Sequence, residues 1–118
     1  MTVLELAIAQ LVAYNARDIV AFCACYADDV RVLDEHGVCT LDGLAAFRDV
    51  YGRMFAEHAV VGGVIEGRVV LEPHCVEDER WWRTHGTTGA ESGGRVLVRY
   101  TAREGRIQTV QFMRGADA

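Results

Sequence analysis

Long apolar runs, prolines and basic clusters are scarce in this chain of 118 residues. No apolar stretch approaches the roughly 18–20 residues that cross a bilayer, and the N-terminal residues show neither a basic segment nor a small-residue cleavage site. We therefore expect a cytoplasmic protein with no membrane partner. The single proline and the lack of a Ser-, Pro- or Gln-rich run leave no linker, so residues 1–118 are expected to form one domain.

Basic residues are few and of one kind, since the sequence contains no lysine and its twelve arginines are spread between acidic residues. Binding to nucleic acids by counterion release needs a concentrated basic face, whereas this chain has a net charge of −5. A nucleic-acid partner is therefore not expected. Hydrophobic residues make up 51% of the sequence, which is enough for a sizeable core.

The four cysteines, Cys23, Cys25, Cys39 and Cys75, include no Cys-x-x-Cys pair, and the four histidines form no i,i+4 pair. On a helix, Cys23 and Cys25 would point about 200° apart, so they cannot chelate one ion. We expect these residues to be thiols buried in the core of a protein in a reducing compartment. Neither a metal nor a cofactor is predicted.

Hydrophobic spacing predicts three helices in the first half of the chain. Residues 3–15 carry apolar side chains at helical intervals, with Leu4, Ile8 and Leu11 on the expected buried face. A short second helix and a longer third helix follow. Polar residues are expected to cap all three: Thr2 (in a capping box with Glu5), Asp18 and Asp42.

Strands are predicted between the second and third helices and throughout the second half. A short hairpin is expected over residues 30–34 and 38–41, and four long strands over 60–72, 75–85, 95–102 and 106–114. The pair Gly62-Gly63 indicates a bulge or a sharp bend of a curved sheet in the first long strand. Helices gathered on one face of a bent sheet give an α+β layer with a cavity at its centre.

Four segments then carry a resemblance to a known family, and they lie in the expected order along nearly the whole chain: 14–18, 22–34, 41–51 and 100–107. In these segments the chain resembles the nuclear transport factor 2-like superfamily, specifically its ketosteroid isomerase and SnoaL-like branch. The resemblance implies a cone-shaped barrel of a curved antiparallel sheet, with three N-terminal helices that close a central pocket. It also implies a homodimer formed through the convex face of the sheet. The fold alone does not fix a reaction.

Asp34 is the first candidate for a catalytic residue. It follows Asp28 by six positions, and the resemblance implies that an aspartate at this spacing is the general base. Strand alternation places Val30, Val32 and Asp34 on one face. In an apolar cavity, desolvation would raise the basicity of this carboxylate. The alternative is that Asp34 is a polar residue at the mouth of the hairpin.

The other groups implied by the isomerases are missing. The position of their tyrosine corresponds to Gln10, and that of their protonated aspartic acid to Leu97 or Arg99. Tyr14, one helical turn beyond Gln10, could supply a hydroxyl or could simply line the core. Arg99 could hold a carboxylate or enolate oxygen, or could belong to an exposed charged face. True steroid isomerase activity is therefore not expected.

Several further residues have both a functional and a structural interpretation. His36 could carry a proton near neutral pH, or could be a solvated turn residue. Trp81 and Trp82 lie on opposite faces of one strand, so one indole, assigned here to Trp81, should wall the cavity. The acids at 77–79 could pair with arginines of the next strand or mark a polar dimer surface. The family's cavity-lining positions, which would also suit an ordinary core, correspond to Phe47, Val50, Met54 and Phe112.

Two functions from different classes remain open. The first is a pocket protein that acts as a cofactor-independent isomerase, lyase (dehydratase) or cyclase, with Asp34 as general base on a small apolar substrate. The alternative is a non-catalytic module for ligand binding or homodimerisation. The aspartate at the base position favours the enzyme, whereas the loss of both oxyanion groups favours the module.

Overall fold

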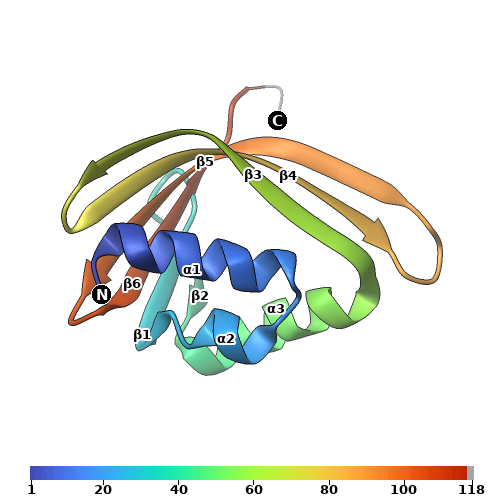
Figure 1. The fold of residues 1–118 in the computed structure, drawn as a ribbon, viewed down its shortest axis with the longest axis horizontal. Coiled ribbons are helices and arrows are strands. Elements are labelled where there is room, and N and C mark those ends of the chain that lie inside the picture. Colours follow the sequence, from blue (N-terminus) through green and yellow to red (C-terminus); the bar gives the residue numbers. More distant parts are fainter. Residues whose placement is uncertain (117–118) are drawn as a thin grey trace.

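The computed structural model describes residues 1–116 of the chain, and it has the predicted order of helices and strands (Figure 1). The elements in chain order are α1 (Val3–Asn15), α2 (Ile19–Cys23), β1 (Tyr26–Leu33), β2 (Cys39–Asp42), α3 (Leu44–Glu57), β3 (His58–Leu71), β4 (His74–His85), β5 (Glu91–Arg103) and β6 (Arg106–Met113). The expected α+β class is confirmed. Each predicted long strand is present, with boundaries that differ by a few residues.

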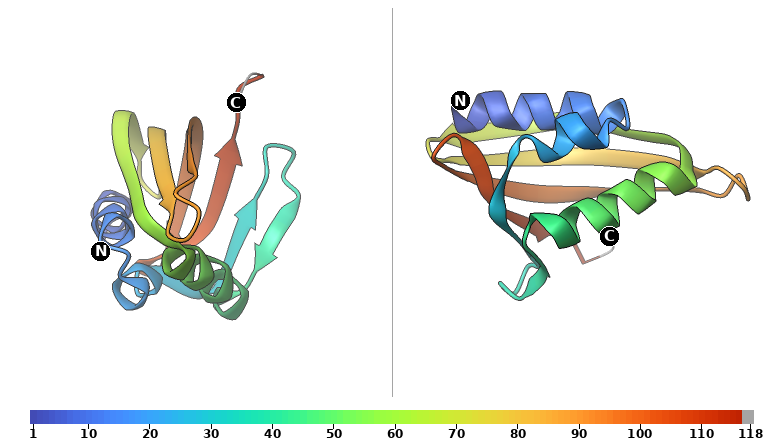
Figure 2. Two further views of the ribbon diagram at one scale, coloured as in Figure 1. Left: turned by 90° about the vertical axis from the view of Figure 1, so that its right-hand side faces the viewer. Right: turned by 90° about the horizontal axis from the view of Figure 1, so that it is seen from below.

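A six-stranded sheet forms one layer, in the order β2-β1-β6-β5-β4-β3. The sheet bends strongly without closing, and the three helices cover its concave face (Figures 1 and 2). The predicted cone is therefore confirmed. One pair, β1 with β6, is parallel rather than antiparallel, which is possible because a long stretch of chain connects these two strands.

The helix N-termini follow the predicted caps in two cases of three. Thr2 forms the capping box with Glu5, and the carboxylate of Asp18 accepts a hydrogen bond of 3.0 Å from the backbone of Ala21. The cap predicted at Asp42 was wrong, because Asp42 ends β2. The cap of α3 is Gly43, whose φ of 92° suits glycine, and no side chain bonds the helix end there.

The buried face of α1 matches the predicted one only in part. The helical spacing that groups Leu4, Ile8 and Leu11 includes Ala7, which is fully buried. However, Leu6 is fully buried too, whereas Ile8 is 46% exposed and Leu11 is only half-buried. Apolar residues occur all round this helix, so their spacing does not single out one face.

The pair Gly62-Gly63 does not form the predicted bulge, because the register irregularities of β3 lie on either side of it. The glycines instead allow close approach. A Cβ on Gly62 would lie 2.3 Å from the indole of Trp82, and one on Gly63 would lie 3.2 Å from Leu11 of α1. Asn15 also fastens the end of α1 to Gly63, accepting from its N–H at 2.8 Å and donating to its carbonyl at 3.2 Å.

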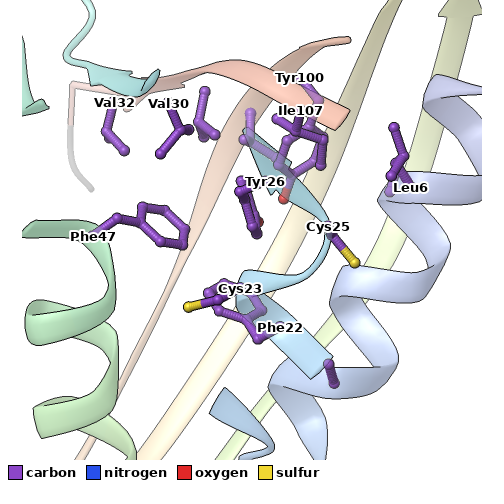
Figure 3. Packing of buried hydrophobic residues seen from close by; sticks show 14 of the residues in the cluster. Leu6, Phe22, Cys23, Cys25, Tyr26, Val30, Val32, Phe47, Tyr100 and Ile107 are labelled. Atoms are coloured by element: carbon purple, nitrogen blue, oxygen red, sulfur yellow. The ribbon is translucent and has the colours of Figure 1, made fainter. Parts of the chain in front are cut away.

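The core lies between the helices and the concave face of the sheet. Phe22 of α2, Tyr26 of β1 and Phe47 of α3 gather at its centre (Figure 3). The rings of Phe22 and Phe47 are stacked, with centroids 5.5 Å apart. All four cysteines are free; Cys39 is half-buried, and the expected burial is confirmed for Cys23, Cys25 and Cys75.

Candidate functional site

A cavity of about 220 Å³ lies between the concave face of the sheet and the helices. Seven of the ten predicted site residues line it: Gln10, Tyr14, Phe47, Val50, Met54, Trp81 and Phe112. Helical spacing brings residues from one face of α3 to the cavity, and alternation along β4 brings Glu79, Trp81 and Arg83. Most of the wall is aromatic or aliphatic, so polar groups on it are few and distinct.

Within residues 1–116, Glu79 is the only acidic residue that lines the cavity. Burial raises the pKa of its carboxyl from 4.5 to about 7, and the nearby charge of Glu77 adds to this increase. Within residues 1–116, Glu79 has no hydrogen bond or ion pair, whereas the fully buried Glu77 is held by Arg68 through bonds of 2.7 and 2.6 Å. Glu79 is therefore a carboxyl group that can exchange a proton near neutral pH.

Four tyrosines surround the same space: Tyr14, Tyr26, Tyr51 and Tyr100. Burial raises the pKa of each, and the charge of Glu79 adds to the increase in all four, so their phenols stay neutral hydrogen-bond donors. The hydroxyl of Tyr26 donates to Oε1 of Gln10 at 3.1 Å, and Nε2 of Gln10 donates to the carbonyl of Ala7. In the part of the chain that the structure describes, the other three hydroxyls have no protein partner.

Two arginines complete the cavity wall. The guanidinium carbon of Arg83 lies 4.5 Å from the ring centroid of Trp81, a cation–π contact. The indole of Trp81 lies against Gly94, where a Cβ would be 3.2 Å from the ring. Arg114 follows the end of β6 and also lines the cavity.

Asp34, the predicted base, lies outside this cavity. Its Oδ1 accepts the backbone N–H groups of His36 and Val38, each at 2.9 Å, and so closes the β1–β2 turn. It borders a separate hollow of about 230 Å³ that shares Phe112 and Arg114 with the main cavity. His36 is exposed on the turn. The catalytic roles of Asp34 and His36 thus stay predictions, and the geometry agrees with the alternative of polar hairpin residues.

Arg99 also lies away from the cavity. Its neighbours Val98 and Tyr100 are buried on the cavity side, and alternation turns Arg99 to the opposite face of the sheet. There its Nη2 donates to Oε1 of Gln111 at 2.8 Å. It is half-buried rather than freely exposed.

Sequence reasoning missed Glu79, Tyr51, Arg83 and Arg114 as cavity residues. The signal for Glu79 was present, since Trp81 was expected on the cavity wall and residues two apart on a strand share a face. Asp78, on the opposite face, pairs with Arg95 of β5 at 2.7 Å, as expected for an arginine of the next strand. Glu77 instead pairs with the preceding strand.

No three His, Cys, Asp or Glu side chains among residues 1–116 lie close enough together to hold a metal ion. None of the helices described is long and apolar enough to span a membrane.

Comparison with known proteins gives a consistent family. The profile of the SnoaL-like domain matches residues 7–110. A cystatin-fold protein from Novosphingobium aromaticivorans is 24% identical, with a TM-score of 0.82 over 97% of this chain and 99% of that one. A putative polyketide cyclase from Pseudomonas putida is 20% identical, with a TM-score of 0.76 over 99% and 94%.

A protein with a ketosteroid isomerase-like fold from Catenulispora acidiphila, in complex with trimethylamine, is 15% identical, with a TM-score of 0.77 over 95% and 86% of the two chains. No curated protein matches the chain significantly. These likenesses establish the fold, and the profile match covers most of the sequence. The chain therefore belongs to the SnoaL-like domain family of the nuclear transport factor 2-like superfamily.

Proposed function

We propose that this protein catalyses a cofactor-free proton transfer on a compact, largely apolar carbonyl compound, with Glu79 as the general acid–base. The observation that carries the proposal is an unpaired carboxyl on an aromatic cavity wall, whose pKa of about 7 suits proton exchange at neutral pH. Family membership supports a pocket protein of the isomerase or cyclase type.

The chemistry needs only groups of this chain. The carboxylate of Glu79 takes a proton from the carbon next to the substrate carbonyl, and the electron pair of that C–H bond forms an enolate. A phenol from Tyr14 or Tyr51 donates a hydrogen bond to the enolate oxygen. In a β,γ-unsaturated substrate, protonated Glu79 then returns the proton to the far carbon of the dienolate, which moves the double bond and isomerises the substrate. If the enolate carbon instead attacks a second carbonyl of the same molecule, the new alkoxide takes the proton from Glu79, and the product is a ring that carries a hydroxyl group.

Both outcomes have support in the comparisons. A similar structure is described as a putative polyketide cyclase, and another as having a ketosteroid isomerase-like fold. Gln10, which replaces the tyrosine of the isomerases, is already bonded to Tyr26. The oxyanion donors must therefore come from other tyrosines, and this favours a reaction other than steroid isomerisation.

Asp34 remains a second candidate for the base, with Tyr14 and His36 as partners. A non-catalytic binding module remains the alternative function, supported by the absence of the oxyanion groups that the resemblance implies at Gln10 and at Leu97 or Arg99.

The test is the exchange of carbon-bound hydrogen for deuterium in small ketones such as 2-tetralone and cyclohex-2-enone, followed by NMR in D₂O. We expect Glu79→Gln to abolish the exchange above the buffer rate, and Asp34→Asn to retain it. Glu91→Gln, which alters an exposed carboxyl at the start of β5, is the matched control. Loss of exchange in Asp34→Asn alone would reverse the assignment of the base. Wild-type exchange at the buffer rate would favour the binding module.

We also propose a homodimer through the convex face of the sheet, as the family resemblance implies. On this face Trp82 is 43% exposed and Leu97 is 44% exposed. The ion pair of Asp78 with Arg95 lies beside Leu97 and would add a polar component to such an interface.

A further inference from the structure

The cavity wall carries two cations that have no ion-pair partner in the part of the chain that the structure describes. Arg83 and Arg114 both line the cavity. Within residues 1–116, neither takes part in an ion pair or a side-chain hydrogen bond. Four other arginines of the chain are paired with carboxylates: Arg68, Arg80, Arg95 and Arg103. Arg83 is half-buried, so its charge is partly removed from water without a partner in residues 1–116, which is unfavourable. Arg114 is exposed at the rim of the cavity.

Within residues 1–116, Glu79 forms no ion pair with either arginine, and neither arginine is among the causes of its pKa shift. Glu79 lies four residues from Arg83 on the same face of β4, so the two backbone positions are about 13 Å apart. Glu79 lies opposite Val96 of the neighbouring strand β5. Leu97 of β5 lies opposite Met113 of β6, so the next step of the same register places Arg114 beside Val96. Arg114 is thus two strands from Glu79, or about 10 Å.

Both arginines line the one cavity, with backbone positions about 16 Å apart, since Arg83 lies opposite Ser92 of β5 and Arg114 lies beside Val96 two strands away from β4. The guanidinium of Arg83 folds back over the ring of Trp81, at 4.5 Å from its centroid, and so lies toward the cavity. Both arginine charges also act to lower the pKa of Tyr51, although burial dominates and raises it. Because both long side chains border the same cavity, an anion held between them can contact both guanidinium groups.

We propose that Arg83 and Arg114 bind a carboxylate of the substrate, while its apolar ring fills the aromatic cavity and its reacting carbon lies against Glu79. The last clause rests on the proposed function, whereas the anion binding does not. A guanidinium fork matches the two oxygens of a carboxylate, and the volume of about 220 Å³ leaves room for a compact ring system with one such group. The substrate class is therefore a small cyclic keto acid.

The experiment is calorimetric titration with three carboxylates, cinnamate, 2-naphthoate and indole-3-acetate, and with the primary amide of each. We expect the wild-type protein to bind at least one carboxylate about 10-fold or more tightly than its amide, since hydrogen bonds to charged groups contribute this much. Arg83→Gln and Arg114→Gln should each weaken carboxylate binding by about 10-fold to 100-fold and leave amide binding unchanged. Arg31→Gln, an exposed arginine of β1, should have no effect.

Arg83→Lys keeps the charge and removes the fork, and an intermediate affinity for the carboxylate is expected. Arg83→Lys also replaces Arg83→Gln in the test if the glutamine variant does not fold. Equal binding of carboxylates and amides, or binding of neither, overturns the inference. If carboxylate selectivity depends on the two arginines but Glu79→Gln leaves deuterium exchange unchanged, the proposed chemistry fails and the anion site stands. If instead Glu79→Gln abolishes deuterium exchange but the wild-type protein does not prefer carboxylates to amides, the proposed chemistry stands and the anion site fails.

Discussion

The pKa of Glu79 predicts that its own removal will stabilise the protein at alkaline pH. The folded state holds the proton of this carboxyl up to about pH 7, whereas the unfolded chain loses it near 4.5. Between these values the folded state binds more protons than the unfolded state, so stability falls as the pH rises. At about 1.36 kcal/mol for each pH unit, the cost above pH 8 is at most about 3 kcal/mol.

Glu79→Gln removes this cost and keeps the shape of the side chain. The free energy of unfolding of the variant should equal that of the wild type near pH 4, where both side chains are neutral. The variant should become more stable through the range from 4.5 to 7, with a gain of about 3 kcal/mol at pH 8, or about 10 °C in Tm for a domain of this size.

Urea unfolding followed by circular dichroism at pH 4, 6 and 8 measures the difference directly. Glu91→Gln, an exposed carboxyl of β5, corrects for the change in net charge. A stabilisation of equal size at pH 4 and pH 8 would show that the carboxyl is not desolvated in the fold. A variant that is less stable at pH 8 would mean that the ionised carboxylate has a partner, and the proposed role of Glu79 would lose its basis.

Three other predictions concern the frame around the site. Gly62→Ala should destabilise the fold by about 1–3 kcal/mol, because the new Cβ would overlap the indole of Trp82. The control is Gly67→Ala, where a Cβ meets only ordinary contacts. Equal shifts of Tm in the two variants would refute the argument. Arg68→Met should lower the free energy of unfolding by about 3–5 kcal/mol, because it leaves the buried Glu77 unpaired. In urea unfolding, adding Glu77→Gln to this variant should restore part of the lost stability. No recovery would show that the loss does not come from the unpaired Glu77. Leu97→Arg on the convex face should convert the proposed dimer into a monomer in light scattering, and an unchanged mass would exclude this face as the interface.

The fold could be predicted from the sequence because its signals are local and repeated. Helical spacing, the caps at Thr2 and Asp18, and β-rich segments separated by turn residues all indicate the observed order. The buried face of α1 could not be predicted in the same way, since apolar residues occur on every side of this helix and only contact with the sheet selects Leu6 over Ile8. The parallel pairing of β1 with β6 joins segments far apart in the sequence, and no local pattern records it.

The site residues also divide into those that local patterns predict and those that depend on long-range packing. Alternation along β4 is a local pattern, and it places Glu79 on the same face as Trp81. The position of Asp34 depends on how the β1–β2 turn closes, and there its carboxylate bonds to the backbone of the turn. The resemblance placed the base by its spacing from Asp28. Spacing cannot report whether a carboxylate is already occupied by backbone N–H groups or is free on a cavity wall.

Two features together determine the chemistry of the cavity. Glu79 is buried in its wall, and Arg83 and Arg114 have no ion pair among the residues that the structure describes. A carboxyl whose pKa is near 7 can take and return a proton at little cost, but only while no cation holds it in the ionised form. Within residues 1–116 neither arginine forms an ion pair with Glu79 or contributes to its pKa shift, so both charges remain available to a ligand. Under the two proposals, the same sheet wall holds an anion at one point and exchanges a proton at another. The distance between these points would then select substrates in which a carboxylate and an acidic C–H bond lie on opposite sides of one compact ring.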